Sequence, residues 1–498
     1  MRVFNPAFWL SVCLLLTLAA CSRNAVTGKR QVILMSKEQE IALGQQSHPS
    51  VVASMGLYED KQMQAFINEK GKAMAAISHR PDLPYQFYIV DSPVVNAFAV
   101  PGGYVYFTRG IMAHFNNEAE FAGVLGHEIG HITAQHSARQ QTSQLFGTGA
   151  VILGSIFLDK TGQLTEAAAQ GLQLALLGYS RAHESESDEI GVGYSSKIGY
   201  DAREMSKFFG TIKRIQDKSG QAVPQFMSTH PDPGNRLTRV RELAQEYQKQ
   251  NPAQYQIERD RYLRLIDGMV FGEDPKQGFV ENDVFYHPEL KFQFPVPRGW
   301  KHQNSPEQFQ MGPKEGKSAM ILMGAKGTSL DEAGQNLVKE LNLNVLESSR
   351  TSLNGIPALL LISQQKPQQQ EQGQPQAANQ QQQARQTNQN TLQIGTWLIQ
   401  TNSGIFALHG LASAADFNNA FATFQSVAGG FRILTDPDKI NRKPDRVQVK
   451  AAPRDGTFAD AMTALGMPAS KLEELGTLNS LQTSDRVQRG YLLKVIER

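Results

Sequence analysis

A His-Glu-Ile-Gly-His sequence at residues 127–131 constrains this chain more than any other feature. It lies in a stretch, residues 117 to about 141, whose apolar side chains recur at helical spacing. At about 100° per residue, His127 and His131 lie one turn apart on the same helix face, where both imidazoles reach a single ion. Glu128 is rotated about 100° from His127, so its carboxylate lies beside the open coordination position and can take a proton from water. The motif predicts a helix that carries a catalytic zinc site.

The remaining ligands of such a site must be histidine or carboxylate side chains. Cys13 and Cys21 are the only cysteines of the sequence, and both precede the folded body, which therefore has neither a disulfide nor a thiolate zinc site. A catalytic zinc ion takes three protein ligands and leaves a fourth position open. The residues three and six positions beyond His131 are not the Gly and His of a metzincin. The third ligand is therefore expected from another segment, and the acidic stretch 180–188 is the best candidate.

The charge balance of the chain argues against a polyanionic partner. Lys and Arg number 49 against 47 Asp and Glu, which gives a formal net charge of +2. This near balance offers no electrostatic footprint for nucleic acid, so no nucleic-acid partner is expected.

The length of 498 residues predicts two to four domains in an α+β multidomain chain. Helical patterns and two strand runs predict a mainly helical domain with a small β-sheet over residues 21–274. Strand runs and a helix predict an α/β domain over residues 280–436, interrupted by a loop at residues 364–390. In that loop 14 of 27 residues are Gln, which cannot bury enough apolar surface to order itself. A strand, two helices and a strand are expected over residues 444–498.

Two of these domains resemble known folds. Strand residues 292–296, the Pro-Arg-Gly-Trp sequence at 297–300 and a helix at 416–431 together resemble the PsbP-like α/β sandwich. The pattern of residues 447–495 looks like a LysM-type glycan-binding module, a resemblance that implies peptidoglycan as a partner. The alternative for this small βααβ unit is a docking domain.

The first 20 residues predict an export signal. Arg2 precedes an apolar run, residues 8–18, which is too short to span a bilayer. The run leads into Leu-Ala-Ala-Cys, which resembles a bacterial lipoprotein lipobox; Cys21 would be lipidated and become the new N-terminus. Ser22, by resemblance to Gram-negative lipoproteins, points to the outer membrane and a periplasm-facing protein. The alternative is a secreted protein in which this cysteine is incidental.

Four segments together resemble a known peptidase family. In chain order they are Asn96–Gly103, the His-Glu helix, Ser180–Asp188, and Thr229-His230-Pro231 with Arg236. They resemble the family M48 gluzincin peptidases, which include HtpX and the CAAX prenyl protease, and especially the periplasmic lipoprotein branch. The resemblance spans most of residues 24–250, about half of the chain, and implies one zinc ion per chain.

The resemblance also implies roles for individual residues. Glu184 is implied as the third zinc ligand, beside His127 and His131. Asp188, one turn further along the same helix face, is implied as a group that fixes a ligand imidazole from behind, and Arg236 as another outer residue of the site.

His230 is a further candidate, because it lies in a proline-bounded loop and matches the family motif. If it points at the metal, it can hydrogen-bond the oxyanion of the reaction and assist catalysis. If it binds zinc itself, the site closes and the enzyme is latent. A histidine that only stabilises its loop is the third alternative.

Neighbouring polar residues are expected to be structural. His136 is rotated about 140° from His131 and so faces elsewhere on an unbroken helix. His183 is also expected to be a structural residue. Glu186 is rotated about 200° from Glu184, which predicts a solvated helix charge.

The strand that begins at Asn96, Ala97 and Phe98 is a candidate for substrate binding. A strand at the edge of a cleft pairs with an extended peptide through main-chain hydrogen bonds, largely without regard to sequence. The alternative is an interior strand of the sheet.

Together these features predict a lipid-anchored zinc endopeptidase that faces the periplasm. The family resemblance implies quality control, with unfolded, misfolded or stalled cell-envelope proteins as substrates. One alternative is a chaperone or assembly factor for outer-membrane proteins that keeps the zinc fold as a scaffold. The other is a peptidoglycan-associated module dominated by the C-terminal unit.

Overall fold

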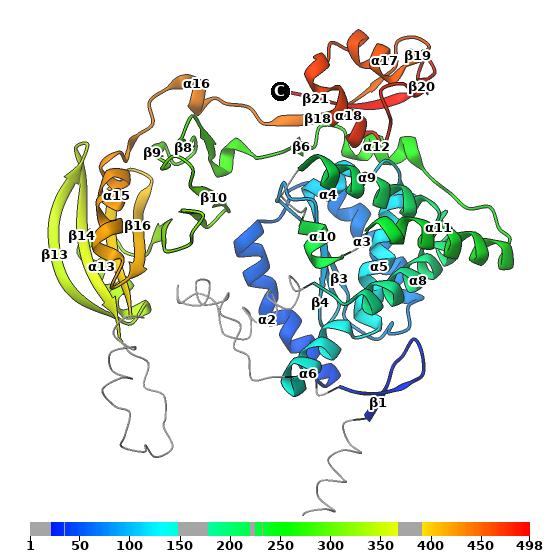
Figure 1. The fold of residues 1–498 in the computed structure, drawn as a ribbon, viewed down its shortest axis with the longest axis horizontal. Helices are drawn as coiled ribbons and strands as arrows, with labels where there is room; N and C mark the ends of the chain where they lie inside the picture. Colours follow the sequence, from blue (N-terminus) through cyan, green and yellow to red (C-terminus); the bar gives the residue numbers. More distant parts are fainter. Residues whose placement is uncertain (1–20, 34, 148–177, 220–224, 232, 367–390) are drawn as a thin grey trace, which may run out of the picture. The chain divides into compact units, whose positions relative to one another are not determined.

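The computed structural model describes residues 21–33, 35–147, 178–219, 225–231, 233–366 and 391–498 (Figure 1). The predicted signal peptide and most of the predicted glutamine-rich loop lie outside the described residues. The described residues fall into two compact units. Unit 1 contains the described residues within 1–156, 164–272 and 445–498. Unit 2 contains the described residues within 273–444. Both units mix helices and strands, which confirms the predicted α+β multidomain class.

Unit 1 is mainly helical. Its helices are α2 (Lys37–Met55), α3 (Lys61–Ala76), α4 (Arg109–His114), α5 (Glu118–Thr133), α6 (His136–Gly147), α8 (Arg181–Lys197), α9 (Glu204–Ser219), α10 (Gln225–Thr229), α11 (Pro233–Gln250), α12 (Arg259–Ile266), α17 (Phe458–Ala464), η2 (Ala469–Lys471) and α18 (Leu472–Leu478). Its strands are β1 (Cys21–Arg23), β2 (Arg30–Val32), β3 (Gln86–Val90), β4 (Ala97–Val100), β5 (Tyr104–Thr108), β6 (Val270–Phe271), β18 (Asp445–Ala451), β19 (Gly456–Thr457), β20 (Arg486–Val487) and β21 (Leu492–Glu497). None of the described helices, in either unit, is both long and apolar enough to cross a membrane.

A small three-stranded sheet lies against the helices of unit 1. Its order is β3-β5-β4, with β3 parallel and β4 antiparallel to β5. Gly102 and Gly103 form the turn between β4 and β5 at φ values of 87° and 102°, where a Cβ atom would be strained. β4 is one of the two edge strands of the described sheet, and β3 is the other.

The helix with the His-Glu motif is shorter than the sequence predicts. Asn117 caps α5, and its side chain accepts a hydrogen bond from the backbone N–H of Glu120. The expected single helix over residues 117–141 is wrong, because α5 ends at Thr133 with Ala134 as its cap, and Gln135 takes a left-handed φ of 57°. A new helix, α6, begins at His136 and changes the direction of the chain.

Two glycines let α5 and α8 approach closely. A Cβ atom on Gly126 would lie 2.8 Å from the carbonyl oxygen of Gly191. A Cβ atom on Gly191 would lie 2.9 Å from the backbone nitrogen of His127. The two helices are therefore in backbone contact, and this contact brings the acidic residues of α8 to the histidines of α5.

Residues 445–498 share one core with the other elements of unit 1. β18 pairs antiparallel with both β21 and β6, and the C-terminal elements lie beside α12 (Figure 1). Lys494 of β21 is fully buried and donates hydrogen bonds to the carbonyls of Ala113 and Phe115, at 2.8 and 2.9 Å. The predicted order of strand, two helices and strand is present, while the LysM-type resemblance stays a prediction.

Unit 2 is built on two antiparallel sheets. Its elements are η1 (Pro275–Gln277), β7 (Phe279–Glu281), β8 (Val284–His287), β9 (Phe292–Pro295), β10 (Lys301–Asn304), β11 (Gln308–Gly312), β12 (Ser318–Ala325), α13 (Leu330–Glu340), β13 (Leu343–Leu353), β14 (Ile356–Gln365), β15 (Leu392–Thr401), β16 (Gly404–Ser413), α15 (Phe417–Gly429), β17 (Arg432–Ile433) and α16 (Pro437–Ile440). The large sheet has the order β10-β11-β12-β16-β15-β14-β13, and the small one β17-β9-β8-β7.

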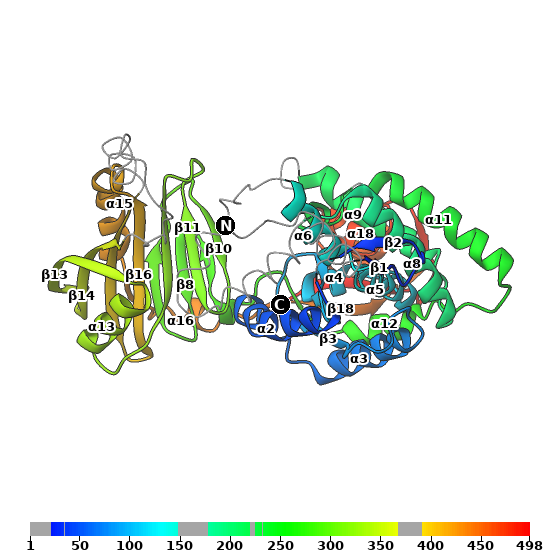
Figure 2. The ribbon, with the colours of Figure 1, turned by 90° about the horizontal axis from the view of Figure 1, so that it is seen from below.

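Alternating side chains of the large sheet face two different cores. Phe406 and Leu408 of β16 belong to the core that contains α15 and the small sheet. Ile405 and Ala407 belong to the core that contains α13. The two helices therefore cover opposite faces of the large sheet, an arrangement that can be followed in Figure 2.

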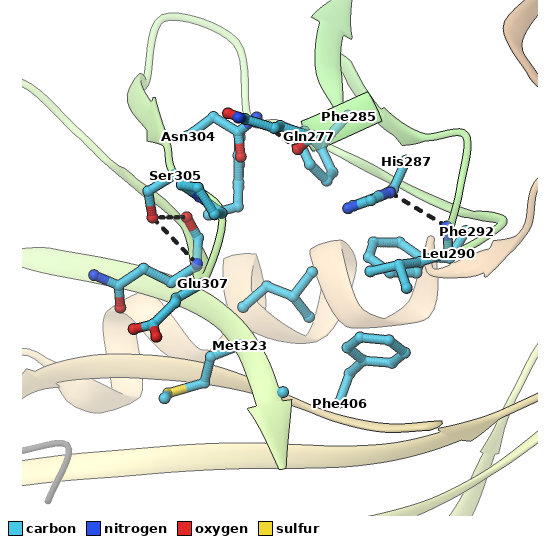
Figure 3. A pocket seen from close by; sticks show the side chains of 15 residues that line it. Gln277, Phe285, His287, Leu290, Phe292, Asn304, Ser305, Glu307, Met323 and Phe406 are labelled. Carbon is cyan, nitrogen blue, oxygen red and sulfur yellow. Dashed lines mark hydrogen bonds between the residues drawn. The ribbon is translucent and has the colours of Figure 1, made fainter. Parts of the chain in front are cut away.

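A cavity of about 330 Å³ opens into the first of these cores (Figure 3). Buried aromatic rings line it, including Phe285, Phe292, Phe309 and Phe406, and His287 lies at its side. No group of three or more metal-ligating side chains lies there, because the one such group among the described residues is in unit 1.

Candidate metal centre

The group in unit 1 consists of His127, His131, Glu184 and His230. Each side chain offers one ligand atom, and these four atoms all lie within 4.8 Å of one another. None of the four residues is more than 2% exposed. Helix α5 supplies the first two histidines, α8 supplies Glu184, and His230 follows α10 directly.

The two histidines of α5 point their Nε2 atoms at one another, 2.9 Å apart. The Nδ1 atom of His127 lies 3.0 Å from an Asp188 oxygen, an acceptor that holds the imidazole proton on Nδ1. Burial lowers the pKa of His127 to about 4 and that of His131 well below its ordinary value. Both rings are therefore neutral at pH 7 and direct nitrogen lone pairs at one point. Two lone pairs this close favour a cation between them, so the donor set fits zinc.

Arg236 of α11 joins the two carboxylates of α8. It donates two hydrogen bonds to Asp188, at 2.6 and 2.8 Å, and its third nitrogen lies 2.7 Å from Glu184. Burial alone would raise the pKa of Glu184, but Arg236 and the neighbouring imidazoles hold it well below its usual range. The structure thus places both outer residues that the family resemblance indicates, Asp188 and Arg236, next to the ligands.

Glu128 is fully buried, and neither of its carboxylate oxygens makes a hydrogen bond within the described part of the chain. Burial raises its pKa to about 7, although the nearby His230 opposes the shift. A carboxylate with a pKa near the working pH can both accept and release a proton.

His230 lies at the centre of the group. Its Nδ1 atom is 3.2 Å from the Nε2 atom of His127 and 3.2 Å from an oxygen of Glu184. Its other nitrogen is 3.6 Å from Glu128 and 3.4 Å from the carbonyl oxygen of Ala97. Burial lowers the pKa of His230, but the carboxylates of Glu184 and Glu128 outweigh it and leave the pKa raised.

The start of β4 borders the same site through its main chain. The carbonyl of Ala97 faces His230, and β4 has a neighbouring strand on one side only within the described sheet. The ring of Phe98 stacks on Tyr106 in a buried cluster, and Asn96 is likewise buried. Any contribution of Phe98 to substrate binding would therefore come from its backbone.

His136 and Glu186 lie elsewhere than the sequence predicts. Because the chain turns at Gln135, His136 folds back and its Nδ1 atom lies 2.8 Å from Nδ1 of His131. Glu186 is not a solvated charge, since it contacts His136 at 3.2 Å and Arg139 at 2.8 Å. The hydrogen bond from His136 lowers the pKa of Glu186 to about 2. A helical wheel drawn over an unbroken helix conceals both contacts.

The sequence of this region matches that of a known family. Residues 61–244 match peptidase family M48, and the match includes the ligands from both α5 and α8 and the loop of His230. The chain therefore contains a peptidase family M48 domain. Members of this family are zinc metalloproteases, and the M48 domain of this chain carries their metal site.

Characterised relatives support the same assignment. A beta-barrel assembly-enhancing protease of Yersinia pestis is 30% identical over 252 residues, which is 48% of this chain and 50% of that protein. The protein of the same name in Escherichia coli strain K12 is 28% identical, over 46% of this chain and 48% of its own length. The human mitochondrial metalloendopeptidase OMA1 is 27% identical over 43% of this chain and 44% of its length. The chain spans about half the length of the curated relatives it matches.

Part of the chain is distantly similar to solved structures. Cyanobacterial PsbP from Synechocystis sp. PCC 6803 superposes with a TM-score of 0.22 and 9% identity, over 30% of this chain and 91% of that chain. The PsbP-like resemblance stays a prediction.

Proposed function

We propose that this chain is a zinc endopeptidase that cleaves unfolded or misassembled proteins of the bacterial cell envelope. The observation that carries the proposal is the buried Glu128 carboxylate, which has no hydrogen bond within the described residues and adjoins a converging set of His127, His131 and Glu184. A scaffold or binding protein has no need to bury a carboxylate without a hydrogen-bond partner, because such burial is costly.

The chemistry follows from these residues. A bound zinc ion supplies Lewis acidity, which acidifies a water molecule and polarises a peptide carbonyl. Glu128 takes the proton of the attacking water and passes it to the nitrogen of the leaving amine. Its pKa of about 7 suits both transfers. Asp188 and Arg236 hold His127 and Glu184 in place during the reaction.

The edge strand β4 supports a substrate in extended form. Its open edge and the carbonyl of Ala97, which faces the metal centre, would align a peptide by main-chain hydrogen bonds. Such binding selects for unfolded chain rather than for a sequence. It agrees with the names of the relatives, which include beta-barrel assembly-enhancing proteases.

His230 would gate the site by blocking the access of water to the metal. Its Nδ1 atom lies among the ligand atoms, so in this arrangement His230 occupies the position that an attacking water needs. His230→Ala is expected to raise cleavage of an unfolded substrate severalfold if gating dominates. A loss of cleavage with retained zinc would instead assign His230 to oxyanion binding.

We place the protein at the outer membrane, facing the periplasm, through lipidation of Cys21. The Leu-Ala-Ala-Cys sequence before Ser22 supports this location. Labelling of the expressed protein with a palmitate analogue, lost in Cys21→Ala, tests it. Pelleting of the intact chain with purified peptidoglycan tests the LysM-type resemblance, and no enrichment over a buffer control would remove that partner.

The substrate class is tested with one protein in two states. The chain from Ser22 onward is incubated with an outer-membrane β-barrel protein, either urea-unfolded and diluted or folded in detergent. Cleavage of the unfolded form only, abolished by a chelator and restored by zinc, is the expected result. Equal cleavage of both forms would contradict the selection for unfolded chain, and binding without cleavage would favour the chaperone alternative.

A further inference from the structure

A chain of hydrogen bonds leads away from the ligand His131 on the side opposite to the metal centre. Nδ1 of His131 lies 2.8 Å from Nδ1 of His136, and Nε2 of His136 lies 3.2 Å from Glu186. The carboxylate of Glu186 also accepts hydrogen bonds from Arg139 at 2.8 Å and from Asn24 at 3.4 Å.

The fold holds His136 in this place. The left-handed Gln135 ends α5 and swings His136 back over His131. The side chain of Gln135 donates to Glu40 at 2.6 Å, and Glu40 is paired with Arg80 at 2.8 Å. His136 itself is 0% exposed, so this arrangement is fixed by buried contacts rather than by a surface loop.

The positions of the protons follow from the geometry. His131 directs Nε2 toward Nε2 of His127 and toward Glu184, at 2.9 and 3.4 Å, so with zinc held at Nε2 its proton is on Nδ1. That N–H donates to Nδ1 of His136. His136 must then carry its own proton on Nε2, and this N–H donates to the carboxylate of Glu186. One tautomer of each ring satisfies both hydrogen bonds between His131 and Glu186.

Each ligand histidine is therefore connected by hydrogen bonds to a carboxylate of α8. His127 reaches Asp188 directly at 3.0 Å, while His131 reaches Glu186 through His136. Glu184, two residues before Glu186, is the ligand itself. The alternating acidic residues of α8 thus serve the metal and each of its two imidazoles.

We infer that His136 and Glu186 are positioning residues that fix the tautomer and ring rotation of His131 and strengthen its bond to zinc. The inference rests on the zinc site of the proposed function. Partners of this kind typically change metal affinity by about 10–100-fold when they are removed.

Packing is the rival explanation for His136, because the ring of His183 stacks on it with centroids 4.4 Å apart. His136→Phe keeps a ring and removes both hydrogen bonds. His136→Gln restores an acceptor and a donor without the ring. His183→Phe is the matched control, since it changes the stacked partner and leaves the hydrogen-bond chain intact.

The test uses the chain from Ser22 onward and measures zinc affinity by competition with a fluorescent chelator, together with the absorption spectrum of the cobalt-loaded protein. His136→Phe is expected to weaken zinc binding about 10–100-fold and to shift the cobalt bands, with partial rescue in His136→Gln. His183→Phe is expected to bind zinc as the wild type does. Circular dichroism of each zinc-free protein checks that it is folded.

Glu186→Gln keeps the argument testable if His136→Phe fails to fold. Its control is Glu189→Gln, an exposed residue on the same helix. Glu186→Gln is expected to weaken zinc binding severalfold alone and to add nothing in the His136→Phe background, because the connection is already broken. Unchanged affinity and spectrum in both single variants, or fully additive losses, would overturn the inference. If the wild type itself bound no zinc, the proposed function would fail instead.

Discussion

The close contact between α5 and α8 makes Gly191 a sensitive position. An alanine there places its Cβ atom 2.9 Å from the backbone nitrogen of His127 and 3.2 Å from the carbonyl oxygen of Gly123. Ordinary contact begins at about 3.4 Å, so the helices must separate by about 0.5 Å locally. Because the obstructing atoms belong to the backbone, no side-chain rotation relieves the clash. Glu184 lies two turns away on the same face of α8 and moves with it.

Gly193→Ala is the matched control, since a Cβ atom at Gly193 meets no other atom within 4 Å. Both substitutions gain about 1 kcal/mol from helix propensity. The difference between them therefore isolates the clash, for which overpacking data indicate about 1–3 kcal/mol. Zinc sites tolerate ligand displacements of only about 0.2 Å, so Gly191→Ala should also weaken zinc binding about tenfold or more.

Urea unfolding of the zinc-free proteins, followed by the helical circular-dichroism signal, measures the stability of the helix-rich unit 1. Chelator competition measures zinc affinity. Gly191→Ala should unfold at lower urea than Gly193→Ala and bind zinc more weakly than the wild type. Equal stability of the two alanine variants, together with unchanged zinc affinity, would refute the claim that the glycine contact sets the ligand geometry.

Two further predictions concern the other parts of the chain. Lys494→Met leaves the buried carbonyls of Ala113 and Phe115 without their hydrogen-bond donor. The free energy of unfolding of unit 1, measured in urea, should fall by about 2 kcal/mol. An unchanged urea midpoint would mean that the C-terminal segment is not part of the core of unit 1. Burial lowers the pKa of His409 from 6.5 to about 4. Between these pH values the unfolded state binds more protons than the folded state. The free energy of unfolding of unit 2 should therefore fall by about 3 kcal/mol as pH falls from 6.5 to 4. Trp300 and Trp397 both belong to unit 2 and report this loss by fluorescence, and a His409→Gln variant with the same pH dependence as the wild type would contradict it.

Local patterns in the sequence predicted the elements of unit 1 that depend on near neighbours. The capping box at Ser36, the helix of Met63 to Met74 and the pairing of His127 with His131 all arise within one or two turns. Glu184 was reached through the family resemblance, because helical spacing alone does not say which acidic residue of α8 faces α5.

Local sequence patterns do not predict structure that depends on contacts between distant residues. Gln135 adopts its left-handed conformation with its side chain bound to Glu40, nearly a hundred residues away. The spacing of apolar residues does not indicate that the helix ends there. The relocation of His136 and Glu186 follows from it. Docking of the C-terminal segment through Lys494 depends in the same way on carbonyls far away in the sequence. A lysine within a strand gives no sign in the sequence that it will be buried.

The most direct test of the account measures zinc content and casein cleavage on the same preparations of wild type and Glu128→Gln, each beginning at Ser22. We expect one zinc ion per chain in both proteins, with cleavage of unfolded casein by the wild type and none by the variant. Undiminished cleavage by Glu128→Gln would contradict the role of this carboxylate, and absence of zinc from the wild type would contradict the metal centre itself.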